Sequence, residues 1–374
     1  MKQPVRILQV VTIMNLGGLE SFIMNIYRNI DRSKIQFDFL VHRPERGVFD
    51  DEIERLGGKI YRLSPIRPTR FFSYQKELKA FFREHKEYRT VHSHLNENSA
   101  MVLYVAKKVG IPTRIAHSHA KATAGPYRFL RELIKKKITS YSTLNLACSV
   151  DAGKWLYGSD DFEVFKNSID VKRFRFPENA ERISVLKKEL DFKKTDFIIG
   201  LTARFSLVKN HEFLIDIFNS YLKINQNAKL LLIGDGGLQD DIKAKTRELH
   251  IDDHVVFVGN VNNPEEYLCV MDLFLLTSFN EGMPVVLIEA QCNGLPILMS
   301  DTMPEEIELT GLTCRKSLHC SAMEWAAHID TLRLQHAGNN RTSYENIIKL
   351  KGYDIELNSQ KLLEIYNSEK QKSL

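Results

Sequence analysis

Short apolar runs alternate with amphipathic segments along the first half of the chain. Strands that alternate with helices of this length indicate repeated βαβ units and a parallel, doubly wound sheet. The apolar, β-branched runs predict strands at residues 5–12, 35–41, 59–63, 90–94, 113–117 and 143–148. The segments between them predict helices over residues 19–29, 49–56, 71–85, 98–109 and 127–137.

The same alternation restarts in the second half, after a highly charged connection at residues 171–195. We therefore predict an α/β protein with two Rossmann-like, doubly wound domains facing a cleft. Ligands of such sheets bind beyond the carboxyl ends of the strands. The pattern predicts strands at 197–203, 229–233, 255–258, 273–276 and 295–299, a helix at 211–224 and a last helix at 354–367.

One stretch combines a buried helix with two carboxylates. The apolar run 273–276 predicts a buried strand, and Pro284 suits the first position of a following helix. Residues 285–288 are apolar on every side, so Glu289 interrupts a buried run, where a carboxylate needs a partner or a polar ligand. Glu281 lies eight residues earlier. Carboxylates can bind the hydroxyls of a sugar while the helix end binds a diphosphate, and this combination suits a nucleotide-sugar. Taken singly, either glutamate is equally well explained as solvated.

Polar loops follow the first strand of each half. Arg204 and Lys209 lie in a loop that enters a helix, and two cations there can clamp a diphosphate. Gly17 and Gly18 follow the first strand of the chain, where glycine allows a ligand to approach the backbone closely. Considered alone, the loop with Arg204 and Lys209 could equally be a solvated loop, and Gly17 and Gly18 could equally form a plain tight turn.

Four histidines follow two predicted neighbouring strands. His92 and His94 end one strand, and His117 and His119 end the next. Alternate residues of a strand share a face, so each pair can point the same way. We expect no metal site here, because no acidic or cysteine ligand is placed to complete one. Satisfied structural histidines are the alternative for His92 and His117.

Charge is divided unevenly between the two halves. Residues 1–170 contain 28 Lys+Arg and 18 Asp+Glu, whereas the remainder contains 24 and 29. Basic residues concentrate at 121–137, where they interleave with apolar ones, and Phe72 lies near further arginines. A basic amphipathic helix suggests contact with an anionic membrane, and a solvated helix packed by its apolar side is the alternative. We expect no nucleic-acid partner, because no binding motif accompanies the charge.

The composition is that of a soluble globular protein. We expect neither a signal peptide nor a membrane span, since no apolar run is long enough. The five cysteines lack metal-ligand spacing and suit free thiols in a reducing cytoplasm. We therefore expect a cytoplasmic protein, with the inner face of the plasma membrane as a further docking surface.

The stretch around Glu281 and Glu289 resembles the E-x7-E signature of retaining glycosyltransferases of family 4, which have the GT-B fold. The resemblance places Glu281 near the donor sugar hydroxyls and Glu289 near the donor ribose. Arg204 and Lys209 resemble the R-x4-K element that binds the donor diphosphate in that family. The same resemblance makes four further residues donor-binding: Gly282, Met283, Pro284 and Val285.

The glycine loop and the histidines extend the resemblance over nearly the whole chain. Gly17 and Gly18 are similar to the family's glycine-rich loop, which faces the donor phosphates and the acceptor. The segment 115–120 resembles the stretch that presents a histidine to the reacting centre. His119 is the first choice for that residue and His117 the second, so the implied catalytic residues are these histidines and Glu281.

The resemblance implies a metal-independent enzyme without a cofactor, in which a nucleoside-diphosphate sugar is a co-substrate. It implies an acceptor-side domain at 1–175, a donor domain at 176–353, and a helix at 354–374 that packs back on the first domain. The acceptor would be a saccharide, linked to polyprenyl diphosphate, in capsule or exopolysaccharide synthesis. A sugar-nucleotide epimerase and a non-catalytic sugar-nucleotide-binding module are the alternatives.

Overall fold

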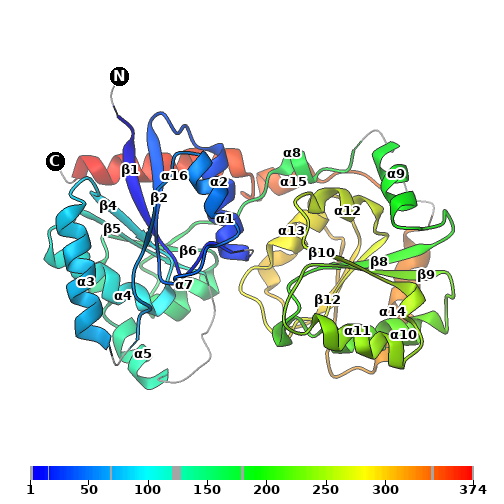
Figure 1. Cartoon of the computed structure of the whole chain (residues 1–374). Coiled ribbons are helices and arrows are strands. Elements are labelled where there is room, and N and C mark those ends of the chain that lie inside the picture. The colour runs from blue at the N-terminus through cyan, green and yellow to red at the C-terminus, as the bar shows by residue number, and fades with distance from the viewer. Residues whose placement is uncertain are drawn as a thin grey trace. The chain divides into compact units, whose positions relative to one another are not determined.

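The computed structural model divides into two compact units, Met1–Ser168 with Asp354–Leu374, and Ile169–Tyr353 (Figure 1). The first division therefore falls at Ser168 rather than at the predicted 175. Side chains of residues 128–131 and 368–372 are outside the described part. The structure describes residues 3–15, 17–67, 70–119, 128–177, 181–337 and 341–372.

The first unit contains a seven-stranded sheet in the order β3-β2-β1-β4-β5-β6-β7, and its neighbouring strands pair in parallel. Six of its strands were predicted, most of them because they contain apolar runs that are buried on both faces, whereas β3 is half-buried. The prediction missed β7, which is only two residues long. The strands are β1 Val5–Val10, β2 Ile35–Val41, β3 Ile60–Arg62, β4 Thr90–Ser93, β5 Thr113–Ser118, β6 Leu144–Ala147 and β7 Glu163–Val164.

The helices of the first unit include one from the far end of the chain. Helix α16 packs on α1, and its residues Ile355, Leu362 and Tyr366 join the same buried core (Figure 1). The prediction missed α7, whose first turn is capped by the Ser149 side chain. The helices are α1 Gly18–Asn29, α2 Asp50–Arg55, α3 Phe71–Glu84, α4 Ser99–Lys108, α5 Arg128–Lys135, α6 Ile138–Tyr141, α7 Val150–Tyr157 and α16 Ile355–Lys372.

The second unit repeats the architecture with a six-stranded parallel sheet in the order β10-β9-β8-β11-β12-β13. Two parallel-sheet, Rossmann-like units confirm the predicted fold class. Its strands are β8 Phe197–Thr202, β9 Ala228–Ile233, β10 Val255–Gly259, β11 Leu273–Leu276, β12 Ile297–Ser300 and β13 Thr313–Lys316. Its helices are α8 Val171–Phe174, α9 Glu181–Glu189, α10 His211–Leu222, α11 Gln239–Glu248, α12 Pro264–Val270, α13 Val285–Cys292, α14 Ala322–Gln335 and α15 Glu345–Leu350.

Each sheet reverses its strand order once, between β1 and β4 in the first unit and between β8 and β11 in the second. Ligands of open α/β sheets bind outside the carboxyl ends of the strands at such a reversal. The described residues of the loops at those ends are 11–15 and 17 after β1, 203–210 after β8 and 277–284 after β11. These three loops carry most of the residues that the sequence analysis selected.

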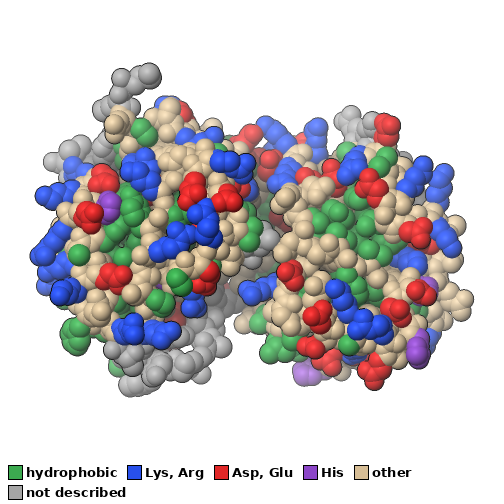
Figure 2. Space-filling model, viewed as in Figure 1, with side chains coloured by type: hydrophobic (Ala, Val, Ile, Leu, Met, Phe, Trp, Pro, Cys, Tyr) green, Lys and Arg blue, Asp and Glu red, His purple; other side chains and the backbone are tan. Residues whose placement is uncertain are grey.

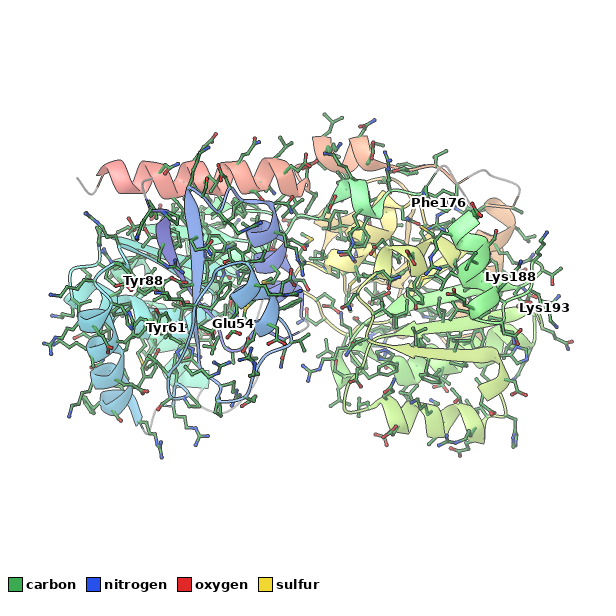
Figure 3. The ribbon with its side chains drawn as sticks, turned by 45° about the horizontal axis from the view of Figure 1, so that its top comes forward. Glu54, Tyr61, Tyr88, Phe176, Lys188 and Lys193 are labelled. Carbon is green, nitrogen blue, oxygen red and sulfur yellow. The ribbon has the colours of Figure 1, made fainter. Side chains whose placement is uncertain are left out.

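A buried polar cluster fixes the edge of the first sheet. The Arg6 guanidinium pairs with Asp38 at 2.5 Å, and the side chain of Asp38 is fully buried. The Tyr88 hydroxyl donates to Asp38 at 2.7 Å and lies 3.2 Å from the Tyr61 hydroxyl, beside which Figure 3 shows it. This carboxylate is fully buried, and its oxygens accept from Arg6, Tyr88 and the Lys59 N–H, so we interpret it as a structural group.

No helix in the described part of the chain combines the length and apolarity that a membrane crossing requires. On the face shown in Figure 2, basic and acidic side chains are interspersed over both units. Part of the predicted basic segment lies outside the described residues. This part contains Lys121 and Tyr127, together with the side chains of Arg128 and Arg131.

Candidate functional site

The loops after β8 and β11 are tied together at the strand-order reversal of the second unit. The Phe279 N–H donates to the Val208 carbonyl at 2.9 Å. The Thr277 hydroxyl donates to the Asn210 carbonyl at 3.0 Å. These two bonds hold the loop that carries Lys209 beside the loop before α13.

The tie brings Lys209 and Glu281 into direct contact. The Lys209 ammonium lies 2.5 Å from a Glu281 carboxylate oxygen, and the two side chains are 19% and 15% exposed. The sequence analysis predicted both residues but not their pairing, because they lie 72 positions apart. A lysine that is neutralised by a carboxylate in the free protein can exchange that partner for a phosphate, while the released carboxylate becomes free to accept from hydroxyls.

Arg204 shares the loop of Lys209 and is exposed. A glycine loop after β9 supports this segment, since the Phe205 N–H donates to the Asp235 carbonyl at 3.1 Å. Gly234 and Gly236 have φ of +129° and +156°, and a Cβ at either would clash with the backbone at 203–205. The sequence analysis predicted the strand at 229–233 but did not select the G-D-G-G run at 234–237 that follows it. Several glycines directly after a strand are the signal that could have indicated this close contact with the loop of Arg204.

Helix α13 begins one residue later than predicted. Pro284 has φ −74° and ψ 97°, which is extended rather than helical, so it caps the helix instead of occupying its first turn. No side-chain hydrogen bond caps this end within the described residues. The amides of the first turn therefore remain available to an anion. Gly282 and Val285 are half-buried on either side, and Met283 is buried.

Glu289 has a different environment from Glu281. Burial raises the pKa of Glu289 to about 7, the charge of Arg173 opposes that rise, and Glu265 adds to it. Arg173 is itself paired with Glu265 at 2.8 Å and donates to the Asn262 carbonyl at 2.5 Å. Arg173 was missed by the sequence analysis, and no local pattern marks it, because α8 meets α13 only through the fold.

The four histidines do converge, at the carboxyl ends of β4 and β5. His92 Nε2 lies 3.2 Å from His117 Nδ1, and His94 Nδ1 lies 2.9 Å from His119 Nε2. The backbone N–H of His119 also donates to Asn96 Oδ1 at 3.1 Å. Ring nitrogens of His92, His94 and His117 lie within 4.8 Å of one another, close enough to share a metal ion. The expectation of no metal therefore stays a prediction.

Burial keeps this cluster neutral. It lowers the pKa of His92 and of His119 to about 3, and it lowers the pKa of His94 and His117 well below the ordinary value. Two ring nitrogens, His117 Nε2 and His119 Nδ1, have no hydrogen-bond partner among the described residues. A neutral imidazole that keeps an open nitrogen can exchange a hydrogen bond with a ligand.

Gly17 and Gly18 lie where β1 passes into α1. Gly17 has extended backbone with φ −166°, so the turn does not need a glycine there for its conformation. A Cβ at Gly17 would meet only the Glu20 carboxylate, and a Cβ at Gly18 would meet nothing within 4 Å. The open space beside Gly18 adjoins the carboxyl end of β1, where ligands of such sheets bind.

Two Rossmann-like units with polar loops at the carboxyl ends of their sheets define the GT-B class of glycosyltransferases. The crystal structure of Anabaena Alr3699/HepE in complex with UDP and glucose matches with a TM-score of 0.78 at 18% identity, over 97% of this chain and 99% of that one. WaaG, a glycosyltransferase involved in lipopolysaccharide biosynthesis, matches with a TM-score of 0.71 at 14% identity, over 96% and 99%.

Sequence comparison gives the family. Residues 183–330 match the family Glycosyl transferases group 1. The chain is 32% identical to EpsF of Bacillus subtilis, which is assigned as a glycosyltransferase, over 97% of this chain and 96% of EpsF. It is 27% identical to the capsular polysaccharide biosynthesis glycosyltransferase CapH of Staphylococcus aureus, over 97% and 99%. The chain therefore belongs to the group 1 glycosyltransferase family.

Proposed function

We propose that this protein is a retaining, metal-independent glycosyltransferase of family 4. It transfers a sugar from a nucleoside-diphosphate sugar to a lipid-linked saccharide in capsule or exopolysaccharide synthesis. The observation that carries this proposal is the contact of Lys209 with Glu281 at the strand-order reversal of the second unit. A cation for phosphate and a carboxylate for hydroxyls stand side by side there, which is the pair of groups that a sugar diphosphate needs.

The second unit binds the donor in this proposal. Lys209 exchanges Glu281 for the diphosphate, and the exposed Arg204 adds a second cation. The amides at the start of α13, around Pro284, bind the same phosphates. Glu281 then accepts hydrogen bonds from the sugar hydroxyls, and Glu289 accepts from the ribose. These groups supply positive charge without a metal ion.

The transfer step follows from that arrangement. The acceptor hydroxyl attacks the anomeric carbon on the face from which the diphosphate leaves, so the configuration is retained. The bond from the anomeric carbon to the diphosphate oxygen breaks, and the departing phosphate takes the hydroxyl proton. Lys209 and Arg204 stabilise the charge that grows on the diphosphate. His119, or His117 as the second choice, contacts the sugar, and Gly18 leaves room for it.

Names of relatives support a lipid-linked acceptor. An Escherichia coli protein, 22% identical over 71% of this chain and 72% of its own length, is a UDP-Gal:alpha-D-GlcNAc-diphosphoundecaprenol alpha-1,3-galactosyltransferase. By analogy, the acceptor of this protein is a saccharide on polyprenyl diphosphate. We infer that the protein works in the cytoplasm at the inner face of the plasma membrane, where such acceptors are embedded.

Exposed apolar residues of the first unit supply a membrane contact in this proposal. Phe72 is 81% exposed and Leu133 is 48% exposed. Lys136 and Lys137, directly after α5, are exposed beside Leu133. We expect Phe72→Ser to weaken sedimentation with anionic phospholipid vesicles. The matched control is Leu350→Ser, which removes a residue that is 87% exposed in the second unit. Equal losses in both variants would contradict a specific docking face.

Transfer of radiolabel from a panel of sugar nucleotides to polyprenyl-diphosphate saccharides tests the enzyme proposal. We expect one sugar nucleotide to be turned over by the wild type and Glu281→Gln to be strongly impaired. Glu306→Gln, which changes an exposed carboxylate of the same unit, should leave the rate unchanged. The product must carry the anomeric configuration of the donor. Donor turnover without acceptor would indicate an epimerase, and binding without turnover would indicate a non-catalytic module.

A further inference from the structure

A continuous chain of buried polar groups runs through the first unit from α16 to His119. It begins at Tyr366, a residue of α16, which lies along the first unit in Figures 1 and 3. The Tyr366 hydroxyl lies 3.1 Å from Gln9 Nε2 and 2.8 Å from His92 Nδ1. Tyr366 is 3% exposed, and Gln9 and His92 are each 1% exposed, so water does not reach these contacts.

Two arms leave this hydroxyl. One arm passes from His92 Nε2 to His117 Nδ1 at 3.2 Å. The other passes through Gln9, whose Oε1 lies 2.9 Å from His94 Nε2, and then from His94 Nδ1 to His119 Nε2 at 2.9 Å. Every link joins two nitrogen or oxygen atoms at hydrogen-bond distance, so each link needs one proton.

The links are not independent of one another. A neutral imidazole has one N–H donor and one acceptor nitrogen, and the Gln9 side chain has an NH₂ at one end and an oxygen at the other. The Tyr366 hydroxyl could accept from both arms, but its own proton would then be buried without an acceptor, which is costly. With that proton used within the chain, the direction of one link fixes the direction of all of them. The chain has only two complete arrangements, one with an N–H at Nε2 of every histidine and one with an N–H at Nδ1 of every histidine.

The orientation of the Gln9 amide selects between these arrangements. Its Oε1, which can only accept, lies 2.9 Å from His94 Nε2, so the proton of that link is on His94 Nε2. Its NH₂ donates to the Tyr366 hydroxyl, whose own proton is then left for His92 Nδ1. The Phe165 backbone carbonyl, which opposes the fall in the pKa of His117 that burial causes, favours the same direction. These contacts require the Nε2–H arrangement throughout.

The second arm then ends in an acceptor. His119 uses its Nε2–H for His94, which leaves Nδ1 with a lone pair and no hydrogen-bond partner among the described residues. A phosphate oxygen has no proton to donate to such a nitrogen, whereas a hydroxyl has one. The His119 ring is therefore set to receive a hydroxyl and to reject a fully ionised phosphate.

We propose that Gln9 and Tyr366 are positioning residues that hold all four histidines as Nε2–H tautomers, so that His119 Nδ1 accepts a hydrogen bond from a hydroxyl of the sugar substrate. The hydroxyl part of this inference rests on the proposed function. The tautomer part does not, because it concerns the free protein. A helix from the far end of the chain thereby sets which hydrogen-bonding group the site presents.

Nuclear magnetic resonance of the full chain labelled with ¹⁵N-histidine tests the tautomers. Each of the four residues is assigned through its own single substitution, among the 12 histidines of the chain. We expect all four in the free protein to show protonated Nε2 and unprotonated Nδ1. An Nδ1–H tautomer at any of them overturns the proposal. So does a metal ion bound stoichiometrically by the purified protein whose removal changes these four signals.

Two variants test the positioning role. Tyr366→Phe removes the hydroxyl that orients Gln9, so we expect mixed tautomers at His94 and His119. Gln9→Glu keeps the acceptor for His94, so both residues should keep their Nε2–H tautomer. The control is Tyr74→Phe, which removes another buried hydroxyl of the same unit, 2.7 Å from a histidine outside the chain. An unchanged His94 and His119 spectrum in Tyr366→Phe overturns the positioning role.

Sugar transfer by the same variants separates the two parts of the inference. If Tyr366→Phe and Tyr74→Phe have the same melting temperature, we expect Tyr366→Phe to lower kcat/KM about tenfold. This is the effect of one misdirected hydrogen bond. Mixed tautomers with unchanged kcat/KM would overturn the contact between His119 and a substrate hydroxyl. Absence of transfer by the wild type would overturn the proposed function and leave the tautomer result standing.

Discussion

The candidate sites of the two units contain opposite kinds of polar group. In the first unit, the four histidines are neutral, three of them are buried and His119 is half-buried, and each link among them is made by a group of the same unit. In the second unit, Lys209 and Glu281 are charged, partly exposed and paired with each other. Burying a neutral polar group costs little free energy when it is hydrogen-bonded, so such groups can be held in place in the free protein. A charged group needs water or an opposite charge until a ligand binds.

This contrast predicts different responses to substitution. Substitutions in the charged site should lower the rate without lowering stability. Its side chains are partly exposed, so their solvation changes little on unfolding. Substitutions in the neutral site should lower stability and change the direction of the remaining hydrogen bonds, because its groups are hydrogen-bonded to one another. Four experiments test the contrast, from the largest expected effect to the smallest.

Lys209→Met should cause the largest loss. It removes a cation that stabilises the departing diphosphate, and loss of one such group costs about 10²–10³ in kcat. The melting temperature should stay within about 2 °C, because Glu281 is partly exposed and can be solvated when its partner is removed. Radiolabel transfer and thermal unfolding measure the two quantities. Lys193→Met is the matched control, since Lys193 is exposed in the same unit (Figure 3). Equal rate losses in both variants would refute the role of Lys209.

Glu289→Gln should change the pH dependence of stability in the second unit. The folded protein raises the pKa of Glu289 from 4.5 to about 7, so it retains a proton that the unfolded chain releases in that window. The wild type therefore loses stability as pH rises from 4.5 to 7. The variant should gain about 1–3 kcal/mol relative to wild type on going from pH 5 to pH 8.

Urea unfolding of wild type and variant at both pH values measures this difference in the free energy of unfolding. Glu305→Gln, an exposed carboxylate of the same unit, provides the control. A difference between wild type and Glu289→Gln that does not vary with pH would show that the carboxyl of Glu289 ionises as freely in the folded protein as in water.

His92→Asn should have the opposite pH signature. The pKa of His92 falls from 6.5 to about 3 on burial, so the unfolded chain takes up a proton that the folded chain refuses. The wild type therefore loses stability as pH falls below 6.5. The decline between pH 7.5 and pH 5.5 should be about 1 kcal/mol smaller in the variant. Urea unfolding with His319→Asn, an exposed site, as control measures it, and identical declines in wild type and His92→Asn would contradict the burial effect.

Gly18→Ala should give the smallest change, with stability and activity moving in opposite directions. Alanine in a helix is favoured over glycine by about 0.5–1 kcal/mol, and the added Cβ meets nothing within 4 Å. The melting temperature should therefore rise. If the open space receives substrate, kcat/KM should fall in the same variant. A more stable enzyme with unchanged kcat/KM would show that the space beside Gly18 stays empty during transfer.

The sequence by itself determined the architecture of both units. Buried parallel strands are continuous apolar runs, so their positions and their alternation with helices are local information. The loops that carry Arg204, Lys209 and Glu281 could also be predicted from the sequence, because each follows such an apolar run. Errors were not confined to the ends of elements, because strand β13 and the helices α9, α11, α12 and α14 of the second unit were not predicted. Pro284 is a cap rather than the first helical residue, and the two-residue β7 has no pattern to detect.

The tertiary structure alone decided which of these groups touch. Lys209 meets Glu281 only because the strand order reverses between β8 and β11. Gln9 and Tyr366 are 357 positions apart, and their contact exists only because α16 returns to the first unit. Side-chain chemistry is fixed residue by residue, but hydrogen-bond direction and buried charge depend on neighbours that the fold supplies. That dependence is why the histidines could be selected from the sequence while their tautomers could not.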